Sequence, residues 1–332
     1  MLEPGIVLLH GPNGAGKTNL LESLHVGTQG FSPRARRDAQ LIRFGAEAGR
    51  ISLKGAAGDA PFSSEVTLTR HESRRVELNG ERLGSSERLR QALTTLVFTP
   101  DRLAVVKGAP ATRRAYLDRS VGRLLPARAT LANDYSAAVG QRNAGLRRVR
   151  AGASTRDALA PWSERVVSLG DELVRSRLQT TELLAPAFAD VAGSLGLDAA
   201  TLTYEGDAPS LRELEDRLDL DLDRGLTGLG PHLHDLRIAA ADRDLRVFGS
   251  QGEQRLAVLA LVLAEAEVLR SRSGSTPLVL MDDVLSELDG DRRASLADLL
   301  AGNAQTVVTA TAAAALPREP TQSLAVSPGE VR

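Results

Sequence analysis

The sequence predicts an α/β fold in which a helical arm is inserted into a lobe that contains a β-sheet. Two apolar runs indicate the sheet: Ile6–Leu9 leads into a glycine-rich loop, and Pro277–Met281 leads into two aspartates. Between them, from Ala109 to about Leu195, long helical patterns replace the short β patterns. The expected lobe is therefore discontinuous, at residues 1–108 and 226–332, and the expected arm, an αα-hairpin, is at 109–225.

The glycine-rich loop has the residue types and spacing of a P-loop. A helical pattern follows it, so its N–H groups and the positive end of a helix dipole are expected to face the same anion. The Lys17 ammonium can reach the β- and γ-phosphates of a nucleotide, and the Thr18 hydroxyl can ligate Mg²⁺. All but three of the 41 basic residues are arginine, so the presence of a lysine at position 17 strengthens the P-loop assignment. The predicted nucleoside triphosphate site is Gly11, Pro12, Asn13, Gly14, Ala15, Gly16, Lys17, Thr18 and Asn19.

Composition limits the other possibilities. A hydrophobic fraction of 42% and a charged fraction of 25% are typical of a soluble globular protein, and no apolar run is as long as a membrane span. The chain has no cysteine, so disulfides and thiolate chemistry are excluded and a cytoplasmic location is expected. With a net charge of −1, affinity for nucleic acid would have to come from a local basic patch. Aromatic residues, at 3%, are too few for a base-stacking platform.

The remaining elements are expected as follows. β-Strands are predicted at 50–54, 65–70, 74–78, 93–99 and 306–309, with a type I′ turn at Asn79-Gly80. An apolar stripe that includes Trp162, Val166, Leu169 and Leu173 predicts a long helix packed on another near 127–150, and ordinary core packing explains it better than a partner groove. Further predictions are a charged helix within 204–223, a hairpin of 236–240 with 245–248, and helices at 256–269 and ending near 300.

The two aspartates that follow the second apolar run are candidates for metal binding and catalysis. A P-loop site needs a carboxylate at the end of a buried strand to hold Mg²⁺, directly or through water, and Asp282 with Thr18 would supply oxygen ligands. Asp283 is placed to orient or deprotonate the attacking water, so Lys17 and Asp283 are the catalytic candidates. Because Asp283 is shorter than a glutamate, its carboxylate would sit farther from the water. We therefore expect a weak base and slow hydrolysis.

A second anion-binding helix terminus is predicted at Ser250, Gln251, Gly252 and Glu253, just before the helix at 256–269. Taken alone, the motif is explained better by a plain helix N-cap. In a chain that already has one phosphate-binding loop, it suggests a nucleotide sandwiched between two subunits. Ser250 of one subunit would then face the γ-phosphate held by the other.

Together these motifs resemble the ABC-type ATPases of the branch shared with SMC proteins, and most closely the RecF family of DNA repair proteins. Two departures are visible. Leu233-His234-Asp235 stands where a basic-acidic pair is usual, and the switch histidine of transporter ATPases has no counterpart in 307–311. No Q-loop glutamine is assigned, since Gln29 and Gln40 are both poor candidates. The resemblance is carried by segments 14–22, 41–45, 230–232, 250–255 and 282–289.

The resemblance implies an ABC/SMC-type head with an inserted helical arm, which binds ATP with Mg²⁺ and dimerises around two nucleotides. It implies binding to double-stranded and gapped DNA, and help to RecR and RecO in loading RecA, with slow, DNA-stimulated hydrolysis. Candidate DNA contacts are the arginine clusters, for which solvated surface is the simpler interpretation. These candidates are Arg34, Arg36, Arg37, Arg113, Arg114, Arg147 and Arg148.

Two other functions remain open from the sequence. An ATP-binding subunit of a membrane transporter would need a groove for a coupling helix and usually a switch histidine, which this sequence lacks. An ATP-gated structural clamp with negligible hydrolysis would keep the same motifs. Turnover measured with and without gapped DNA separates the clamp from an active ATPase.

Overall fold

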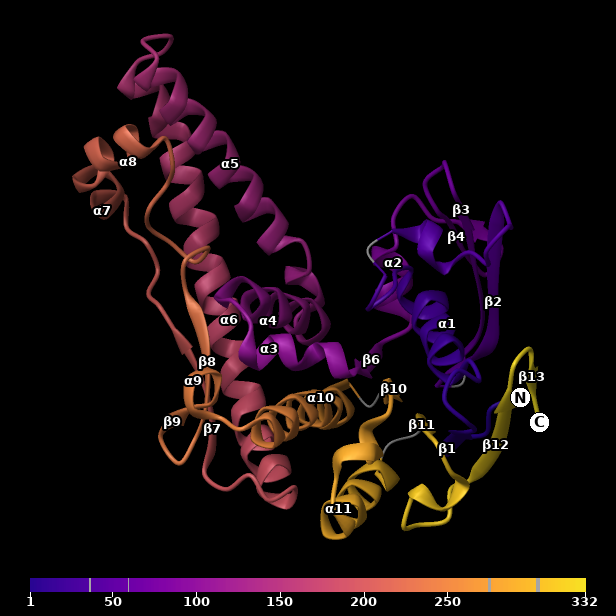
Figure 1. Ribbon diagram of the computed structural model, residues 1–332. Coiled ribbons are helices and arrows are strands. Elements are labelled where there is room, and N and C mark those ends of the chain that lie inside the picture. The colour runs from indigo at the N-terminus through magenta and orange to yellow at the C-terminus, as the bar shows by residue number, and fades with distance from the viewer. Residues whose placement is uncertain (36, 59, 274–275, 303–304) are drawn as a thin grey trace. The chain divides into compact units, whose positions relative to one another are not determined.

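The computed structural model describes residues 1–332 except 36, 59, 274–275 and 303–304 (Figure 1). Close contacts divide the chain into two compact units, and we describe each by itself. The first contains Met1–Leu103, Asp190–Leu197 and Gln251–Arg332, and the second contains Ala104–Ala189 and Asp198–Ser250. Residues 226–250 are thus grouped with the helical unit, whereas the sequence expectation placed them in the lobe. The expected domain boundaries stay a prediction.

The main sheet of the first unit has six strands in the order β13-β12-β1-β11-β10-β6. Every pairing is parallel except that of β12 with β13. The central strands are nearly continuous aliphatic runs because a parallel sheet is buried on both faces. Their bounds are β1 Gly5–His10, β6 Thr95–Phe98, β10 Leu278–Met281, β11 Gln305–Ala310, β12 Gln322–Ser327 and β13 Glu330–Val331.

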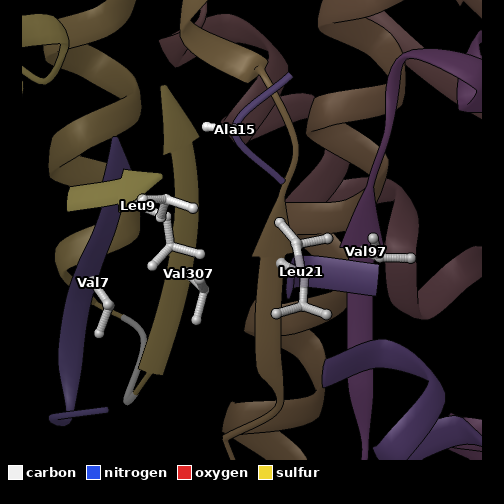
Figure 2. Close-up of a cluster of buried hydrophobic side chains, with 8 residues drawn as sticks. Val7, Leu9, Ala15, Leu21, Val97 and Val307 are labelled. Carbon is white, nitrogen blue, oxygen red and sulfur yellow. The ribbon is translucent and has the colours of Figure 1, made fainter. Parts of the chain in front are cut away.

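Helix α1 (Lys17–Gln29) packs its apolar side on this sheet. Figure 2 shows Leu21 over the sheet, between Val307 and Val97, and each of these three side chains is at most 1% exposed. The helix ends at Gly30, whose left-handed conformation lets its N–H bond the Val26 carbonyl. This core fixes the start of α1, and with it the P-loop, against the ends of the strands.

A second, antiparallel sheet in the first unit has the order β2-β3-β4-β5. Its apolar side, with Val66, Leu68 and Val76, packs on Val26 of α1. The predicted type I′ turn is confirmed, because Asn79 and Gly80 both have positive φ. The bounds here are η1 Asp38–Leu41, β2 Ala48–Ala57, β3 Ala60–Thr69, β4 Arg75–Leu78, β5 Glu81–Arg82, α2 Glu87–Ala92 and η2 Pro100–Leu103.

The last helices of the first unit are η5 (Val284–Glu287), η6 (Ala313–Ala315), α10 (Gln251–Ser273) and α11 (Gly290–Ala301). Helix α10 packs on β6 and η2, and every residue from Leu256 to Ala266 is buried. All of these residues except Glu265 are apolar, and a helical segment that is apolar on all sides is typical of a buried element. In the described part of the chain, no helix is long and apolar enough to cross a membrane.

The second unit is built on a pair of long helices, α5 and α6, which run alongside each other (Figure 1). Of the predicted stripe, Val166, Leu169 and Leu173 are buried against α5, whereas Trp162 is 39% exposed. The helices are α3 Ala104–Lys107, α4 Pro110–Leu124, η3 Pro126–Arg128, α5 Leu131–Arg150, η4 Arg156–Leu159, α6 Ala160–Ser194, α7 Leu211–Asp216, α8 Leu218–Arg224 and α9 Leu245–Phe248, and the strands are β7 Ala200–Glu205, β8 Asp235–Ala240 and β9 Arg243–Asp244.

Two elements of this unit differ from the sequence expectation. The predicted hairpin partner at 245–248 is helix α9, because the Asp244 side chain caps it by accepting a hydrogen bond from the Arg246 N–H. Strand β8 instead pairs along its length with β7. Tyr204 therefore lies in a strand, and the charged helix expected within 204–223 is the pair α7 and α8.

Candidate functional site

The predicted P-loop joins the end of β1 to the start of α1. Gly14 and Gly16 have φ of 80° and 100°, a region that a side chain with a Cβ adopts only with strain. Gly16 is also the N-cap of α1. The loop therefore ends where the first, unpaired N–H groups of a 13-residue helix begin, which is a favourable environment for phosphate.

Lys17 is the first residue of α1, and its ammonium lies over the loop. Its Nζ donates hydrogen bonds to the carbonyl oxygens of Gly11 at 2.7 Å and Pro12 at 2.9 Å. Both acceptors are neutral carbonyls, so the positive charge keeps no carboxylate partner among these contacts. The ammonium is thus available at the loop for an anion.

Asp282 follows β10, and β11 separates β10 from the P-loop strand β1. Asp282 is buried, with only 5% of the residue exposed. Oδ1 accepts two hydrogen bonds, from Thr18 Oγ1 at 3.0 Å and from Thr309 Oγ1 at 2.8 Å. The structure thus brings together the two oxygen donors that the sequence predicted for Mg²⁺.

These donors fit a magnesium ion that is held jointly with phosphates. Thr18 and Asp282 supply hard oxygen atoms, and one or two protein ligands are usual when substrate phosphates and water complete the coordination. Among the described residues there is no cluster of three or more His, Cys, Asp or Glu that could hold a metal. A metal bound here would therefore depend on the nucleotide for the rest of its ligands.

Asp283, the predicted base, is exposed and has a left-handed backbone, with φ of 50° and ψ of 32°. Its N–H donates to Thr309 Oγ1 at 2.8 Å, and its carbonyl accepts from Ser286 Oγ at 3.0 Å. Arg255, on α10, lies within electrostatic reach. Burial lowers the pKa of the Arg255 guanidinium, and the Asp283 charge opposes that shift.

An open cavity of about 280 Å³ contains the P-loop and both aspartates. Polar side chains and loop glycines line it, so it suits a charged, hydrogen-bonding ligand. Six of the predicted nucleotide-binding residues are in the lining, whereas Gly11, Pro12 and Ala15 are not. The lining residues are Asn13, Gly14, Gly16, Lys17, Thr18, Asn19, Arg34, Asp282, Asp283, Thr309 and Thr311.

The predicted signature residues lie at the start of α10. Ser250 immediately precedes the helix, and Ser250, Gln251 and Gly252 are exposed, while Glu253 is half-buried. Gln251, Gly252 and Glu253 are not among the described residues that line the cavity of their own chain. The terminus of this 23-residue helix is therefore accessible from solvent.

The predicted DNA-contacting arginines have different environments. Arg34 lines the cavity, with Nε 3.9 Å from Asp101 Oδ2. Arg37, Arg147 and Arg148 are exposed, whereas Arg114 is half-buried and donates to the His234 carbonyl oxygen. Arg36 lies outside the described residues.

Arg113 requires a correction. It is 2% exposed, and its guanidinium donates two hydrogen bonds of 2.7 Å to Asp235 and others to the carbonyls of Val106 and Gly108. This side chain holds β8 against α4 and presents no surface to DNA. The charge pattern of the sequence could not reveal it, because Asp235 is 122 residues away.

Sequence reasoning missed two residues of the site. Thr309 was assigned only to a strand, but its hydroxyl contacts both aspartates. Arg34 was assigned to DNA, but it lines the nucleotide cavity. A usable signal for Thr309 was a hydroxyl residue near the carboxyl end of a buried parallel strand, where ligands of α/β sheets bind.

Fold and site define this chain as an α/β ATPase head of the SMC/RecF type with a long helical insertion. Residues 1–326 match the family described as RecF/RecN/SMC N terminal domain. The chain belongs to the RecF family of DNA replication and repair proteins within it. The RecF protein of Heliobacterium modesticaldum is 35% identical over 322 residues, which are 93% of this chain and 87% of that protein. That of Anaeromyxobacter sp. (strain K) is 37% identical over 330 residues, with the same coverage.

Solved structures agree with this assignment. A structure titled as the recombination mediator protein RecF-ATP in the RecFOR pathway has a TM-score of 0.86 and 26% identity, over 99% of this chain and 91% of that one. An Smc head bound to the C-winged helix domain of ScpA has a TM-score of 0.59 at 18% identity, covering 97% of this chain and 86% of that chain. The second likeness concerns the fold alone.

Proposed function

We propose that this chain is an ATP-dependent DNA-binding protein of recombinational repair, which forms a dimer around two ATP molecules and engages duplex DNA at gaps and junctions. The observation that carries the proposal is the shared oxygen of Asp282, which joins the P-loop residue Thr18 to the end of β10 beside a polar cavity. A solved structure titled RecF-ATP has the same fold over nearly the whole chain, which supports ATP as the nucleotide.

Each part of the site has a proposed role toward ATP. The amides of the loop and of the first turn of α1 cradle the phosphates, and the Lys17 ammonium binds the β- and γ-phosphate oxygens. Thr18 and Asp282 hold Mg²⁺, which neutralises charge on those oxygens. Arg34 lines the same cavity, and this supports a nucleotide phosphate, in place of DNA, as its partner.

The signature residues complete the site of a second copy. Ser250 and the first residues of α10 are exposed, which supports their access to the γ-phosphate of a facing subunit. Asp283 orients the attacking water, and its short, exposed side chain supports slow turnover. ATP would then act mainly as the link that holds two subunits together.

DNA binding is proposed through exposed arginines that contact backbone phosphates. Arg37, Arg147 and Arg148 are exposed residues, and Arg147 Nη1 also donates to the Gly225 carbonyl oxygen at 3.4 Å. With six phenylalanines, three tyrosines and one tryptophan in the chain, we expect little base stacking. By relationship to RecF proteins we further propose a cytoplasmic protein that acts with RecO and RecR to load RecA on gapped DNA.

The test is the size of the purified chain with and without ATP and Mg²⁺, measured by light scattering after gel filtration. The wild type is expected to change from monomer to dimer, and Ser250→Arg is expected to bind ATP with unchanged affinity but remain monomeric. A wild type that stays monomeric at saturating ATP, yet binds duplex DNA normally, would contradict the proposal. A dimer with no measurable hydrolysis, even with gapped DNA, would identify an ATP-gated structural clamp instead.

A further inference from the structure

The hydroxyl of Thr309 lies at the meeting point of the two aspartates. Thr309 is near the end of β11, the strand between β1 and β10. It pairs in register with Leu9 of β1, and the preceding residue, Val308, pairs with Met281 of β10. Thr309 is 1% exposed. Its Oγ1 donates to Asp282 Oδ1 at 2.8 Å and accepts from the Asp283 N–H at 2.8 Å. A single hydroxyl can do both, since it has one proton and two lone pairs.

We propose that Thr309 is the positioning residue of the tandem aspartates, because it fixes the carboxylate of Asp282 and the backbone of Asp283. It thereby sets the rate of hydrolysis and the contribution of Mg²⁺ to nucleotide affinity. It does not set the metal-free affinity of the P-loop for the nucleotide. The inference rests on the proposed function and deepens it. It concerns which residue controls turnover at the same site.

The first part of the argument concerns Asp282. Both of its side-chain hydrogen bonds, from Thr18 and Thr309, fall on Oδ1. Within the described residues, no hydrogen bond engages Oδ2. The carboxylate is thus held by one oxygen and leaves the other for a metal or a metal-bound water. Removal of the Thr309 hydroxyl leaves Thr18 as the only side-chain donor, and Thr18 is itself the proposed second metal ligand.

The second part concerns Asp283. Its left-handed backbone is disfavoured for a residue with a Cβ and persists where neighbouring groups hold it. Two hydrogen bonds do so, from its N–H to Thr309 and from Ser286 Oγ to its carbonyl. Without the Thr309 acceptor the N–H would lose its partner. The backbone would then relax, and the carboxylate that orients the water would move with it.

Lys17 and the loop carbonyls that it contacts are independent of these hydrogen bonds, whereas Thr18 of the same loop shares Asp282 Oδ1 with Thr309. Lys17 donates to the carbonyl oxygens of Gly11 and Pro12, and in the described part of the chain none of these three residues forms a hydrogen bond with the Thr309 hydroxyl. Loss of the hydroxyl should therefore leave metal-free nucleotide binding intact. Outer-shell partners of metal ligands typically contribute about 10- to 100-fold to metal affinity or activity, which sets the expected size of the effect.

The same strand offers a matched control. Thr306 is 0% exposed, and its Oγ1 has no hydrogen-bond partner in the described structure. Thr306→Val therefore removes a buried hydroxyl from β11 without removing a contact. Thr309→Val removes one that makes two contacts, and Thr309→Ser keeps the hydroxyl.

The experiment uses the full chain and compares these three variants with the wild type. Thr309→Val is expected to lower kcat about 10- to 100-fold with KM for ATP changed less than about twofold. In equilibrium binding of a fluorescent ATP analogue, it should match the wild type in EDTA but lose the gain in affinity that Mg²⁺ gives. Thr309→Ser and Thr306→Val should keep both the turnover and the Mg²⁺-dependent gain.

Thermal melting in the absence of nucleotide shows whether each variant folds, and Thr309→Ala replaces Thr309→Val if the latter does not. The inference is overturned if Thr309→Val keeps wild-type turnover and Mg²⁺ dependence, if Thr309→Ser is as impaired as Thr309→Val, or if Thr306→Val is equally impaired. These results would leave the proposed function standing. A wild type that binds no ATP would instead refute the proposed function.

Discussion

Arg142 and Asp221 form an ion pair from which water is fully excluded: the guanidinium Nη1 lies 2.8 Å from Oδ2, and both residues are 0% exposed. The pair joins α5 to α8 within the second unit. Arg142 also donates to Ser163 and Thr227, while Asp221 accepts from the Gly228 N–H. These additional bonds matter because buried charges stabilise a fold only when their hydrogen-bonding capacity is met.

Removal of one partner of this pair should destabilise the second unit strongly. We expect Arg142→Ala to lower the free energy of unfolding by at least about 2 kcal/mol, because Asp221 would lose its fully buried partner and keep only the half-buried Arg217, whose Nε lies 3.2 Å from Oδ1. Arg148→Ala on the same helix, where the side chain is exposed, should change it by less than about 0.5 kcal/mol. Urea unfolding followed by circular dichroism measures both. Equal stability of the two variants would contradict the buried-pair interpretation.

Lys17 and Asp282 should separate nucleotide binding from turnover. Lys17→Met removes charge-assisted hydrogen bonds to phosphate, each worth about 1.5–3 kcal/mol, so ATP affinity should fall at least about a hundredfold and the dimer should be lost. Asp282→Asn should reduce turnover far more than ATP affinity. Lys54→Met, at an exposed position on β2, is the control. Calorimetric titration with ATP provides the measurement, and normal binding by Lys17→Met would refute the site assignment.

The length of the side chain at 283 should set the rate of hydrolysis. Asp283→Glu extends the carboxylate by one methylene toward the water, so we expect single-turnover hydrolysis to accelerate. The lifetime of the ATP-bound dimer is then expected to become shorter. Asp283→Asn removes the base and should slow hydrolysis. Rapid-quench assays of single turnovers check this. Fast hydrolysis by the wild type that slows in Asp283→Glu would show that the weak-base interpretation is wrong.

Exposed arginines should govern the salt dependence of DNA binding. If Arg147 and Arg148 each neutralise a phosphate, then Arg147→Ala/Arg148→Ala should weaken binding to gapped duplex and reduce the slope of log affinity against log salt by about two. Arg212→Ala, which removes a side chain that is 89% exposed, is the control and should leave the slope unchanged. Fluorescence anisotropy at several salt concentrations measures the slopes. An unchanged slope in the double variant would exclude these two contacts.

Two histidines should make the second unit sensitive to acid. Tyr135 donates to His232 Nδ1 at 2.7 Å, and His232 Nε2 bonds the Thr227 carbonyl oxygen at 2.9 Å. Burial lowers the pKa of the His232 imidazole, and nearby Arg114 and Arg177 lower it further, against the opposing effects of the Thr227 bond and Asp221. Burial likewise lowers the pKa of His234, with Arg177, His232 and Arg114 acting in the same direction and Asp207 against it.

Because the folded-state pKa of each histidine lies below its unfolded value of about 6.5, the unfolded chain binds more protons in acid. The stabilisation is complete above that pH and is lost as the pH falls toward the folded-state pKa. Each histidine can contribute at most about 1.4 kcal/mol per pH unit. His232→Gln should flatten the decline in unfolding free energy between pH 7.5 and 5.5, whereas His71→Gln, at an exposed position, should not. Parallel declines in both variants would refute this account.

The site could be predicted from sequence as far as its chemistry is encoded in contiguous residues. The P-loop and the Asp282-Asp283 pair are local motifs, and the structure brings them to one cavity. Thr309 has no motif of its own. Its role arises because β11 lies between the two motif-bearing strands, and strand order is a tertiary property.

The fold, like the site, could be predicted where the signal is local in the sequence and not where it depends on tertiary contacts. Long patterns such as the stripe on α6 predicted their helices, whereas the four residues at 245–248, three of them apolar, suit a strand or a helix equally and were assigned wrongly. Strands β12 and β13 were not predicted, since their short, partly exposed sequences have little apolar periodicity. Arg113 and Arg142 look like surface charges until Asp235 and Asp221 are placed beside them.

Helix α10 starts with exposed residues and continues through eleven consecutive buried ones, from Leu256 to Ala266, packed on β6 and η2. A rod enclosed in this way can neither turn nor slide without displacing the side chains that surround it. Its exposed first residues therefore continue directly into a segment that is held in place by packing on β6 and η2. The first unit thus contains one firmly held helix whose accessible end is at Gln251.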